Sequence, residues 1–431
     1  MADISFSRVE MLPQSAPPAG ETGPIRWVRD RLFSGWFNTL LSLICIYIFY
    51  RLLAWILPWF LHGVWNASSR TECVEIVVRR WGEGATGACF AVIHDRWQQF
   101  LFGFYPADFY WRPTLAFALM LVALAPILFS ALPRKMLWFS LAFPGVAGWL
   151  LWGGSLFVPI AIYAGPVLAV VIYRLIDARG ATALARLAAV AFVILWWLYC
   201  AGPLGRMLGD LLALTPVSSK QFGGFMLSIT IGVTGIAFSL PLGVLLALGR
   251  RSDMFLVKTL SVGFIEFIRG VPLITLLLVA SYLLNIFMPP GTNFDIILRV
   301  IIMVTLFASA YMAEVIRGGL AALPKGQYEG ADALGLDYWK AMRLVIMPQA
   351  LKISIPGIVN TFIGLFKDTT LVSIIGLLDP LGLITSVRSN QNWNGLIWEL
   401  YGFVALMFFI CCFSMSKYSQ YLERKLRTDH R

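Results

Sequence analysis

The chain has 431 residues, of which 59% are hydrophobic and only 13% are charged, and its mean hydropathy is +0.76. This composition excludes an ordinary soluble domain and a disordered chain, and it is typical of an integral membrane protein. The net charge of +11 fits loops that face the cytosol, so it does not indicate a nucleic-acid partner.

Long apolar runs predict an all-α, polytopic bundle. Runs of roughly 17 to 25 residues fit helices that cross an apolar layer of about 30 Å, whereas barrel strands would be short and alternating. The first run follows a polar segment, so no cleavable signal peptide is indicated. About ten spans are expected, near residues 36–58, 114–132, 137–154, 156–173, 187–203, 224–248, 258–286, 296–315, 353–376 and 397–416.

The distribution of Lys and Arg predicts the orientation of these spans. Most of the 34 basic residues fall on the side that also carries both termini, which places the termini in the cytosol. Residues 1–35 and 421–431 are then cytoplasmic tails, and residues 59–113 form a periplasmic loop. Cys73 and Cys89 both lie in that loop, where an oxidising compartment permits a disulfide, but the sequence leaves open whether they are bonded. The histidines and cysteines have no metal-ligand spacing, so no metal site is expected.

The two halves of the chain differ in composition. Residues 36–205 are rich in Trp, Phe and Ala, without a dense polar motif, and are interpreted as an N-terminal transmembrane extension. From residue 221 the spans carry Gly, Pro, Ser and Thr, as in "MLSITIGVTGIAFSLPLGVLLALGRR", which suits close packing and kinked, movable helices. The working module is therefore expected at residues 221–420.

A polar stretch interrupts this module, "YEGADALGLDYWKAMRLVIMPQA" at residues 328–350. Gly335 can end one short helix and let a second begin, and Pro348 suits the break before the next span. The apolar residues of the stretch predict a single stripe, formed by Ala331, Leu334, Tyr338, Met342 and Val345. Taken alone, the stretch is equally compatible with a plain amphipathic helix at the membrane surface.

The spacing within this stretch resembles the EAA loop of ABC importer permeases, here expected at residues 323–350. Glu329, Ala331, Gly335 and Pro348 match its pattern, whereas Gly330, Val345 and Met347 replace the middle Ala, the Ile and the Leu. The change to Gly330 weakens the first helix by up to about 1 kcal/mol. Three more stretches are similar to the polar amino-acid branch of that family: "FIEFIRGVPLI", "YMAEVIRGGL" and "GLFKDTTLVSIIG".

The resemblance implies a type I importer permease of about five C-terminal helices in a bacterial inner membrane, which moves amino acids. It implies that the loop couples to a cytosolic ABC ATPase dimer through Glu329, Gly330, Ala331, Gly335, Met347 and Pro348. It also implies a second permease subunit, identical or homologous, and a periplasmic amino-acid-binding protein. The chain has no Gly-Lys dipeptide and hence no P-loop, so ATP hydrolysis is assigned to the partner, and neither a catalytic residue nor a cofactor is expected in this chain.

Ionisable residues within the spans need a reason, because each costs on the order of 3 kcal/mol in a membrane. Glu266 with Arg269, and Glu314 with Arg317, are three residues apart and are expected to form ion pairs on one helical face. Pro272 predicts a kink just after the first pair.

A second polar group lies deep in the ninth span and is a candidate substrate pathway. It consists of Lys367, Asp368, Thr369 and Thr370. The carboxylate and hydroxyls offer acceptors for an ammonium group. The alternative is an internal Lys–Asp pair, with the threonines bonded to their own helix.

Two other functional classes remain to be weighed. An ion-coupled secondary transporter would show repeats with interrupted helices in both halves, and none is apparent. A membrane enzyme would need a nucleophile with its base, a metal cluster or a cofactor motif, and the sequence offers none of these.

Overall fold

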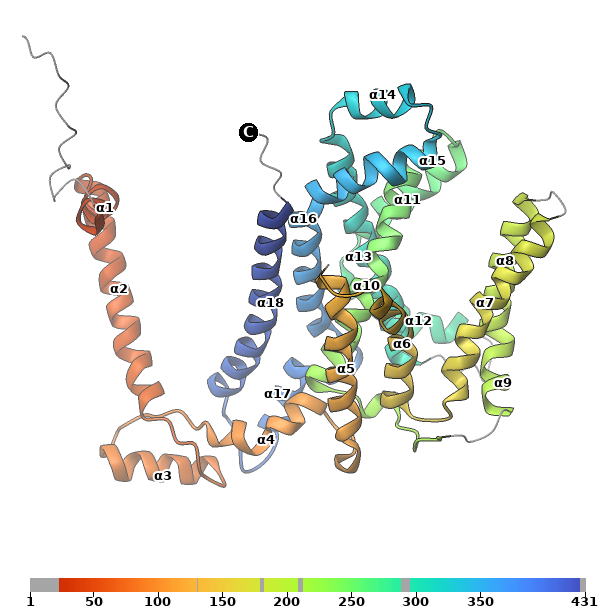
Figure 1. Ribbon diagram of the computed structural model, residues 1–431. Helices are drawn as coiled ribbons and strands as arrows, with labels where there is room; N and C mark the ends of the chain where they lie inside the picture. The colour runs from red at the N-terminus through yellow and green to blue at the C-terminus, as the bar shows by residue number, and fades with distance from the viewer. Residues whose placement is uncertain (1–22, 130, 179–181, 208–211, 288–294, 427–431) are drawn as a thin grey trace, which may run out of the picture. The chain divides into compact units, whose positions relative to one another are not determined.

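The computed structural model describes residues 23–129, 131–178, 182–207, 212–287 and 295–426 (Figure 1). The predicted tails lie partly outside these ranges, at 1–22 and 427–431. Within the ranges the regular structure is helical, which confirms the all-α fold class. Eight helical segments there are long and apolar enough to cross a membrane, and the bent pair α11–α12 makes a ninth. The remaining predicted span, at 137–154, corresponds to α6, Leu137–Trp152, whose 16 residues are fewer than the ~20 that a crossing needs.

The chain divides into two compact units, and the first is residues 1–91. It contains α1 (Gly23–Leu32), α2 (Trp36–Leu61) and α3 (Arg70–Trp81). Ser69 caps α3 by accepting a hydrogen bond from the backbone N–H of Glu72, and Gly82, with φ of +92°, ends it. A disulfide joins Cys73 to Cys89, whose Cα atoms are 5.8 Å apart, and ties α3 to the chain that leads out of the unit. Part of the predicted loop at 59–113 is therefore helical.

The second unit, residues 92–431, begins with α4 (Ala91–Phe102), which starts at the last residue of the first unit. The rest of the predicted extension follows in this unit, so residues 36–205 are divided between the two units. The helices are α5 (Trp111–Leu128), α6, α7 (Phe157–Asp177), α8 (Thr182–Leu195), the π-helical turn η3 (Trp196–Cys200) and α9 (Ala201–Met207). The last three run on as one apolar segment, Leu184–Gly205.

The C-terminal part of this unit corresponds to the predicted working module. It contains α10 (Gly224–Arg250), α11 (Phe255–Gly270), α12 (Leu273–Phe287), α13 (Ile296–Ala321), α14 (Lys325–Ala333), α15 (Tyr338–Ala341), η5 (Met342–Ile346), α16 (Met347–Asp368), η6 (Thr369–Ile375), α17 (Pro380–Arg388) and α18 (Trp398–Leu426). In Figure 1, α14 and α15 lie at the upper end of the unit, and α17 lies near α4 at the lower end. These two ends are called the α14 end and the α17 end below.

Small residues bring α13 into close contact with its neighbours. A Cβ at Gly243 of α10 would lie 2.6 Å from the side chain of Met312, and one at Gly319 would lie 2.5 Å from the carbonyl oxygen of Ala350 on α16. Such positions let helices approach closely without a hydrophobic driving force, as expected in a bilayer. The central helix α13 therefore packs between α10 and α16, as the glycine-rich and serine-rich spans predict.

The predicted span at 258–286 is broken. The axes of α11 and α12 differ by 101°, and the break falls at Val271 and Pro272. Pro272 has no N–H to continue the ladder of α11, and its own carbonyl accepts the N–H of Thr275 at 3.0 Å, so a new helix starts there. The kink predicted at Pro272 is confirmed, and it is sharp enough to separate two helices.

Candidate functional site

The first half of the candidate coupling loop is α14, which ends in a glycine-dependent turn. Gly335 has a φ of +66°, a conformation that L-residues rarely adopt. Its N–H donates to the carbonyl of Asp332 at 2.9 Å, and the N–H of Leu336 donates to Ala331 at 3.2 Å. These two bonds form a Schellman motif, which satisfies the last carbonyls of the helix and stops it. The turn predicted at Gly335 is present.

The second half starts two residues after that glycine. Asp337 caps α15 by accepting the backbone N–H of Lys340 at 2.8 Å, and its carboxylate lies 3.1 Å from the ammonium nitrogen of the same lysine. The backbone hydrogen bond first, and then the lysine side chain, lower the pKa of Asp337 below its usual value. The carboxylate is therefore ionised at neutral pH and stabilises the start of α15.

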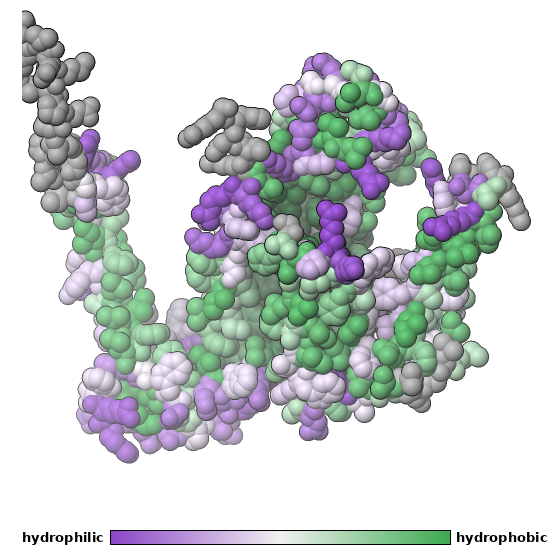
Figure 2. Space-filling view, in the orientation of Figure 1, coloured by the Kyte–Doolittle hydropathy of each residue, from purple (hydrophilic) through white to green (hydrophobic). Residues whose placement is uncertain are grey.

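The loop exposes large apolar side chains at the α14 end. Leu334 is 77% exposed, Trp339 is 70% exposed and Leu344 is 64% exposed, and together they are called the loop patch. In Figure 2 green surface lies among purple at this end. The predicted stripe of five residues is wrong, because Ala331 and Met342 are buried while Leu334 and Tyr338 point to solvent. The turn at Gly335 changes the direction of the chain, so one helical periodicity does not continue through it.

Side-chain hydrogen bonds anchor the loop to the spans. The hydroxyl of Tyr328 donates to the carbonyl of Leu320 on α13 at 3.2 Å and accepts from Arg251, at the end of α10, at 3.0 Å. Gln349 of α16 donates to the side-chain oxygen of Gln327 at 2.8 Å. The loop is therefore attached to three different spans.

The other predicted loop residues divide into exposed and buried positions. Glu329 and Gly330 are exposed on α14, and Ala331 is buried. Met347 starts α16 and is half-buried, and Pro348 follows it in the first turn, where a missing N–H is tolerated. The turn η5 just before them is π-helical, a local adjustment of the kind found where a helical ladder is disturbed.

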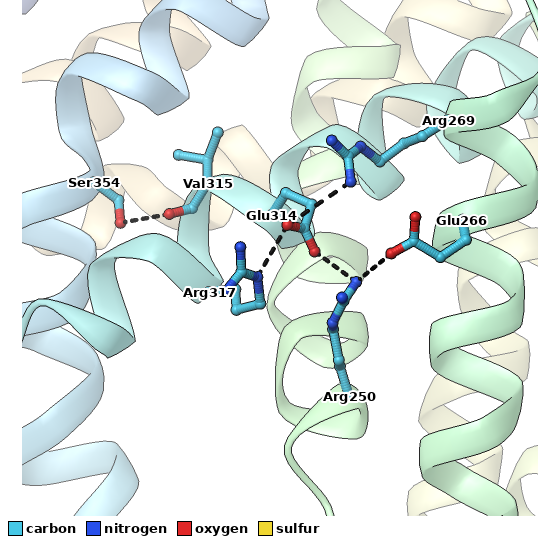
Figure 3. A network of polar contacts seen from close by, with 7 residues as sticks. All are labelled: Arg250, Glu266, Arg269, Glu314, Val315, Arg317 and Ser354. Atoms are coloured by element: carbon cyan, nitrogen blue, oxygen red, sulfur yellow. Dashed lines mark hydrogen bonds and ion pairs between the residues drawn. The ribbon is translucent and has the colours of Figure 1, made fainter.

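A network of charges joins the ends of α10, α11 and α13 (Figure 3). The guanidinium of Arg250 donates to Glu266 at 2.8 Å and to Glu314 at 2.7 Å. Glu314 also accepts from Arg317 at 2.9 Å and lies 3.7 Å from Arg269. Glu314 is the centre of the network because its carboxylate contacts three arginines, and its side chain is only 16% exposed.

This network corrects one predicted pair and adds a residue. Glu266 pairs with Arg250 rather than with Arg269, although Arg269 is three residues away on the same helix. Arg269 turns toward α13, where its guanidinium carbon lies 5.6 Å from the ring centroid of Tyr311. The predicted pair of Glu314 and Arg317 is present. The added residue is Arg250, at the end of α10, which donates to both glutamates.

The candidate substrate pathway lies where α16 changes into η6. Thr369 is fully buried and donates to the carbonyl of Phe366 at 2.8 Å, and Thr370 donates to Lys367 at 2.8 Å. Within the described residues, neither Lys367 nor Asp368 lies within 4.0 Å of an opposite charge. The threonines therefore follow the alternative of bonding to their own helix, while the internal Lys–Asp pair of the same alternative is not a close ion pair in the described structure.

The α17 end of the second unit is held together by close backbone contacts. The N–H of Gly224 donates to the carbonyl of Leu378 at 2.8 Å, and a Cβ on Gly103 would overlap the Cα of Gly223. Asp379 is fully buried and caps α17 by accepting the N–H groups of Leu381 and Gly382 at 3.1 and 2.9 Å. Burial raises the pKa of Asp379 to about 6, even though the two hydrogen bonds of the cap lower the pKa.

The long apolar helices, the small-residue packing and the exposed loop anchored to three spans define a helical membrane permease. A family model described as "Binding-protein-dependent transport system inner membrane component" matches residues 239–428. The glutamate/glutamine/aspartate/asparagine transport system permease protein of Rhodobacter capsulatus is 59% identical over the full length of both chains. An inner membrane amino-acid ABC transporter permease of Escherichia coli K12 is 44% identical over 93% of both chains.

A crystal structure of an amino acid ABC transporter with histidines has 31% identity and a TM-score of 0.42, over 46% of this chain and 90% of that one. The full-length sequence relatives show the family. The chain belongs to the amino-acid ABC transporter permeases and is an integral protein of the inner membrane. The two sequence relatives favour the ATP-driven permease over the ion-coupled transporter.

Proposed function

We propose that this chain carries acidic amino acids and their amides across the inner membrane, driven by a separate ATPase that binds the loop patch. The substrates follow from the full-length relative, whose name gives glutamate, glutamine, aspartate and asparagine. The observation that carries the proposal is the exposed turn of α14 and α15, which is stiff and is bonded to three spans. Both termini and α14 then lie on the cytosolic side, and the α17 end faces the periplasm.

The loop patch suits a groove on another protein. Three large apolar side chains exposed on one short segment are unusual for a surface in water, whereas a protein partner would bury them. Glu329 and Gly330 are exposed on α14, next to the patch in sequence, and belong to the same coupling surface. Motion of the ATPase pair would pass through Tyr328 and Gln327 into α10, α13 and α16.

The complete importer needs further subunits. The charge network and the loop belong to one module of about five helices, which makes half of a pathway, so a second permease, identical or homologous, is part of the proposal. A periplasmic binding protein delivers the amino acid to the α17 end, in line with the family description.

The amino acid passes the end of α16, where the substrate zwitterion meets two charges of opposite sign. Asp368 binds its ammonium group and Lys367 its carboxylate, because neither side chain has an ion-pair partner among the described residues. The buried hydroxyl of Thr369 and that of Thr370 position this part of the chain. Asp368→Asn is expected to raise the KM for uptake at least tenfold while the complex still assembles, and an unchanged KM would remove Asp368 from the pathway.

The coupling role is tested by substitutions at Gly335. Gly335→Val is expected to reduce both co-purification with the ATPase and ATP-driven uptake, because a β-branched residue is strained at a φ of +66° by about 1–3 kcal/mol. The space around the missing Cβ is open, so the effect comes from the backbone alone. Gly335→Asn is the matched control, since Asn tolerates this conformation, and it should keep most of the activity.

Two results would overturn the proposal. The first is that Gly335→Val leaves co-purification and uptake as they are in the wild type. The second is that the chain, reconstituted without any ATPase, takes up glutamate when an ion gradient is applied.

A further inference from the structure

An apolar cavity of about 450 Å³ separates α5 and α6 from α10 and α18. In Figure 2 a green hollow lies between α18 and α5. Every element that lines the cavity belongs to the second unit. The lining comes from α4, α5, α6, α10 and α18, and it includes Ala147 of α6, Val233 of α10 and Cys411 of α18.

The lining suits hydrocarbon and not the transported amino acid. None of the lining residues is charged, so an ammonium or a carboxylate would have no counter-charge. The hydroxyl of Thr114 donates to the carbonyl of Tyr110 at 2.8 Å, and that of Thr230 donates to Met226 at 2.7 Å. These two donors are already used by their own helix, and the third hydroxyl of the lining, that of Thr234, cannot alone give water the two to four polar partners it needs.

Two apolar occupants are considered for this cavity, an acyl chain of a lipid and a helix of another subunit, and the volume of the cavity distinguishes between them. A dry cavity of about 150 Å³ holds one benzene, which is about 25 Å³ per carbon, so this cavity holds on the order of eighteen carbons. A transmembrane helix is about 10 Å wide and rises about 5.4 Å per turn, so the same volume would take roughly one turn of it. One acyl chain fits this volume, whereas only about one turn of a helix of another subunit could enter it.

The contacts around the cavity tie α5 to the module at both ends and leave its middle free. Toward one end, the hydroxyl of Tyr418 on α18 donates to the carbonyl of Leu128 at 2.5 Å. Toward the other, just before α5 in the chain, the ring centroid of Tyr105 lies 5.6 Å from that of Phe222 in the module. An empty space of this size between the two ties would forfeit the dispersion contacts of all its walls.

We infer that an acyl chain of a bilayer phospholipid occupies this cavity and forms the middle of the contact between the extension and the module. The bilayer that surrounds the protein supplies such chains at high local concentration. A fluid chain also keeps α10 and α18 from interlocking with α5 and α6. The two helices of the module are then free to move during transport while the extension stays attached at its ends.

The inference is tested on the complete transporter, purified with its partner subunits and reconstituted with a phospholipid that carries a photoreactive diazirine midway along one acyl chain. Irradiation is expected to crosslink the lipid to peptides of α6 and α10 that line the cavity. Val233→Trp fills the cavity from α10, and Ala147→Phe fills it from α6. Each is expected to reduce these crosslinks at least tenfold and to remove one tightly held phospholipid per chain, counted by native mass spectrometry.

Leu245→Trp is the matched control, because Leu245 lies on α10, is 63% exposed and does not line the cavity. It should leave both measurements unchanged. The inference is overturned if the wild-type protein gives no crosslinks to the lining, or if both filling variants keep the same crosslinks and the same number of lipids. Crosslinking of Cys411 to a helix of a partner subunit would also overturn it.

Discussion

Replacing Glu314 with Gln tests whether one carboxylate holds the ends of three helices together. The amide keeps the shape of the side chain and one acceptor oxygen but removes the negative charge. Arg250, Arg269 and Arg317 then face one another with only Glu266 as a counter-charge. The variant therefore converts a nearly balanced network into a cluster of three like charges.

The structure gives the size of the effect. Hydrogen bonds to charged groups contribute about 1.5–3 kcal/mol each, and Glu314 makes two of them, at 2.7 and 2.9 Å. Its side chain is 16% exposed, so solvent screens it little, but the arginines are 25 to 45% exposed and lessen the loss. We expect the variant to lose about 3 kcal/mol of stability, which lowers the apparent Tm of a module of this size by roughly 6–12 °C.

The measurement is thermal unfolding of the purified transporter, followed by tryptophan fluorescence. Glu266→Gln is the matched control: it removes the same charge from the same network, but Glu266 is 54% exposed and contacts one arginine, so we expect a loss of at most about 1 kcal/mol. In a double-mutant cycle, Glu314→Gln and Arg250→Gln should couple by more than 1 kcal/mol. Equal Tm shifts for the two glutamates, or an additive cycle, would refute the central role of Glu314.

Three further predictions concern single positions. Gly103→Ala should prevent stable folding at the α17 end, because the new Cβ would also lie 2.6 Å from the backbone nitrogen of Gly223. Gly154→Ala is the control: Gly154 has a φ of +85° and open space around it, so this variant should only cost the strain of the backbone. Limited proteolysis separates the two variants, and equal resistance to the protease would contradict the close contact. Gly330→Ala should raise the apparent Tm slightly, by the equivalent of about 0.5–1 kcal/mol, because the position is helical and has open space around it. A lower Tm would contradict this reasoning. The carboxyl of Asp379 has a pKa of about 6 in the folded state and 3.8 in an unfolded chain, so between these two pH values the folded state binds more protons and its stability should fall as the pH rises from 4 to 6. Asp379→Asn should abolish this pH dependence and match or exceed the wild-type Tm at pH 7.5. Parallel profiles of Tm against pH for the two proteins would contradict the prediction.

The sequence was sufficient wherever the cause of a feature is local. The turn at Gly335 follows from the positive φ that only glycine adopts easily, and the break at Pro272 follows from a missing N–H. Glu314 and Arg317 pair because residues three apart on a helix lie on one face. The spans follow from long apolar runs, apart from α6, which falls short of a full crossing.

The sequence was insufficient where a partner lies on another helix. Glu266 had a neighbour at the favoured spacing, but it pairs with Arg250, which is 16 residues away on α10, because α10 and α11 lie side by side. The apolar stripe of the loop was wrong for a related reason, since the periodicity of one helix was extended through a turn that starts another. Hydropathy also gave no sign of the cavity, because its lining residues come from five helices that only the fold brings together.

In the proposed coupling, movement of the loop would reach the spans through the end of α10. Arg250 and Arg251 are adjacent in sequence, yet they act in different directions: Arg250 bonds to α11 and α13, and Arg251 bonds to Tyr328 of α14. A displacement of α14 therefore pulls on the same helix end that holds the charge network. The other half of α10 borders the cavity, where the inferred acyl chain, in place of interlocked side chains, would offer little resistance. The helix would then be held firmly at the end where force arrives and loosely along the face that has to move.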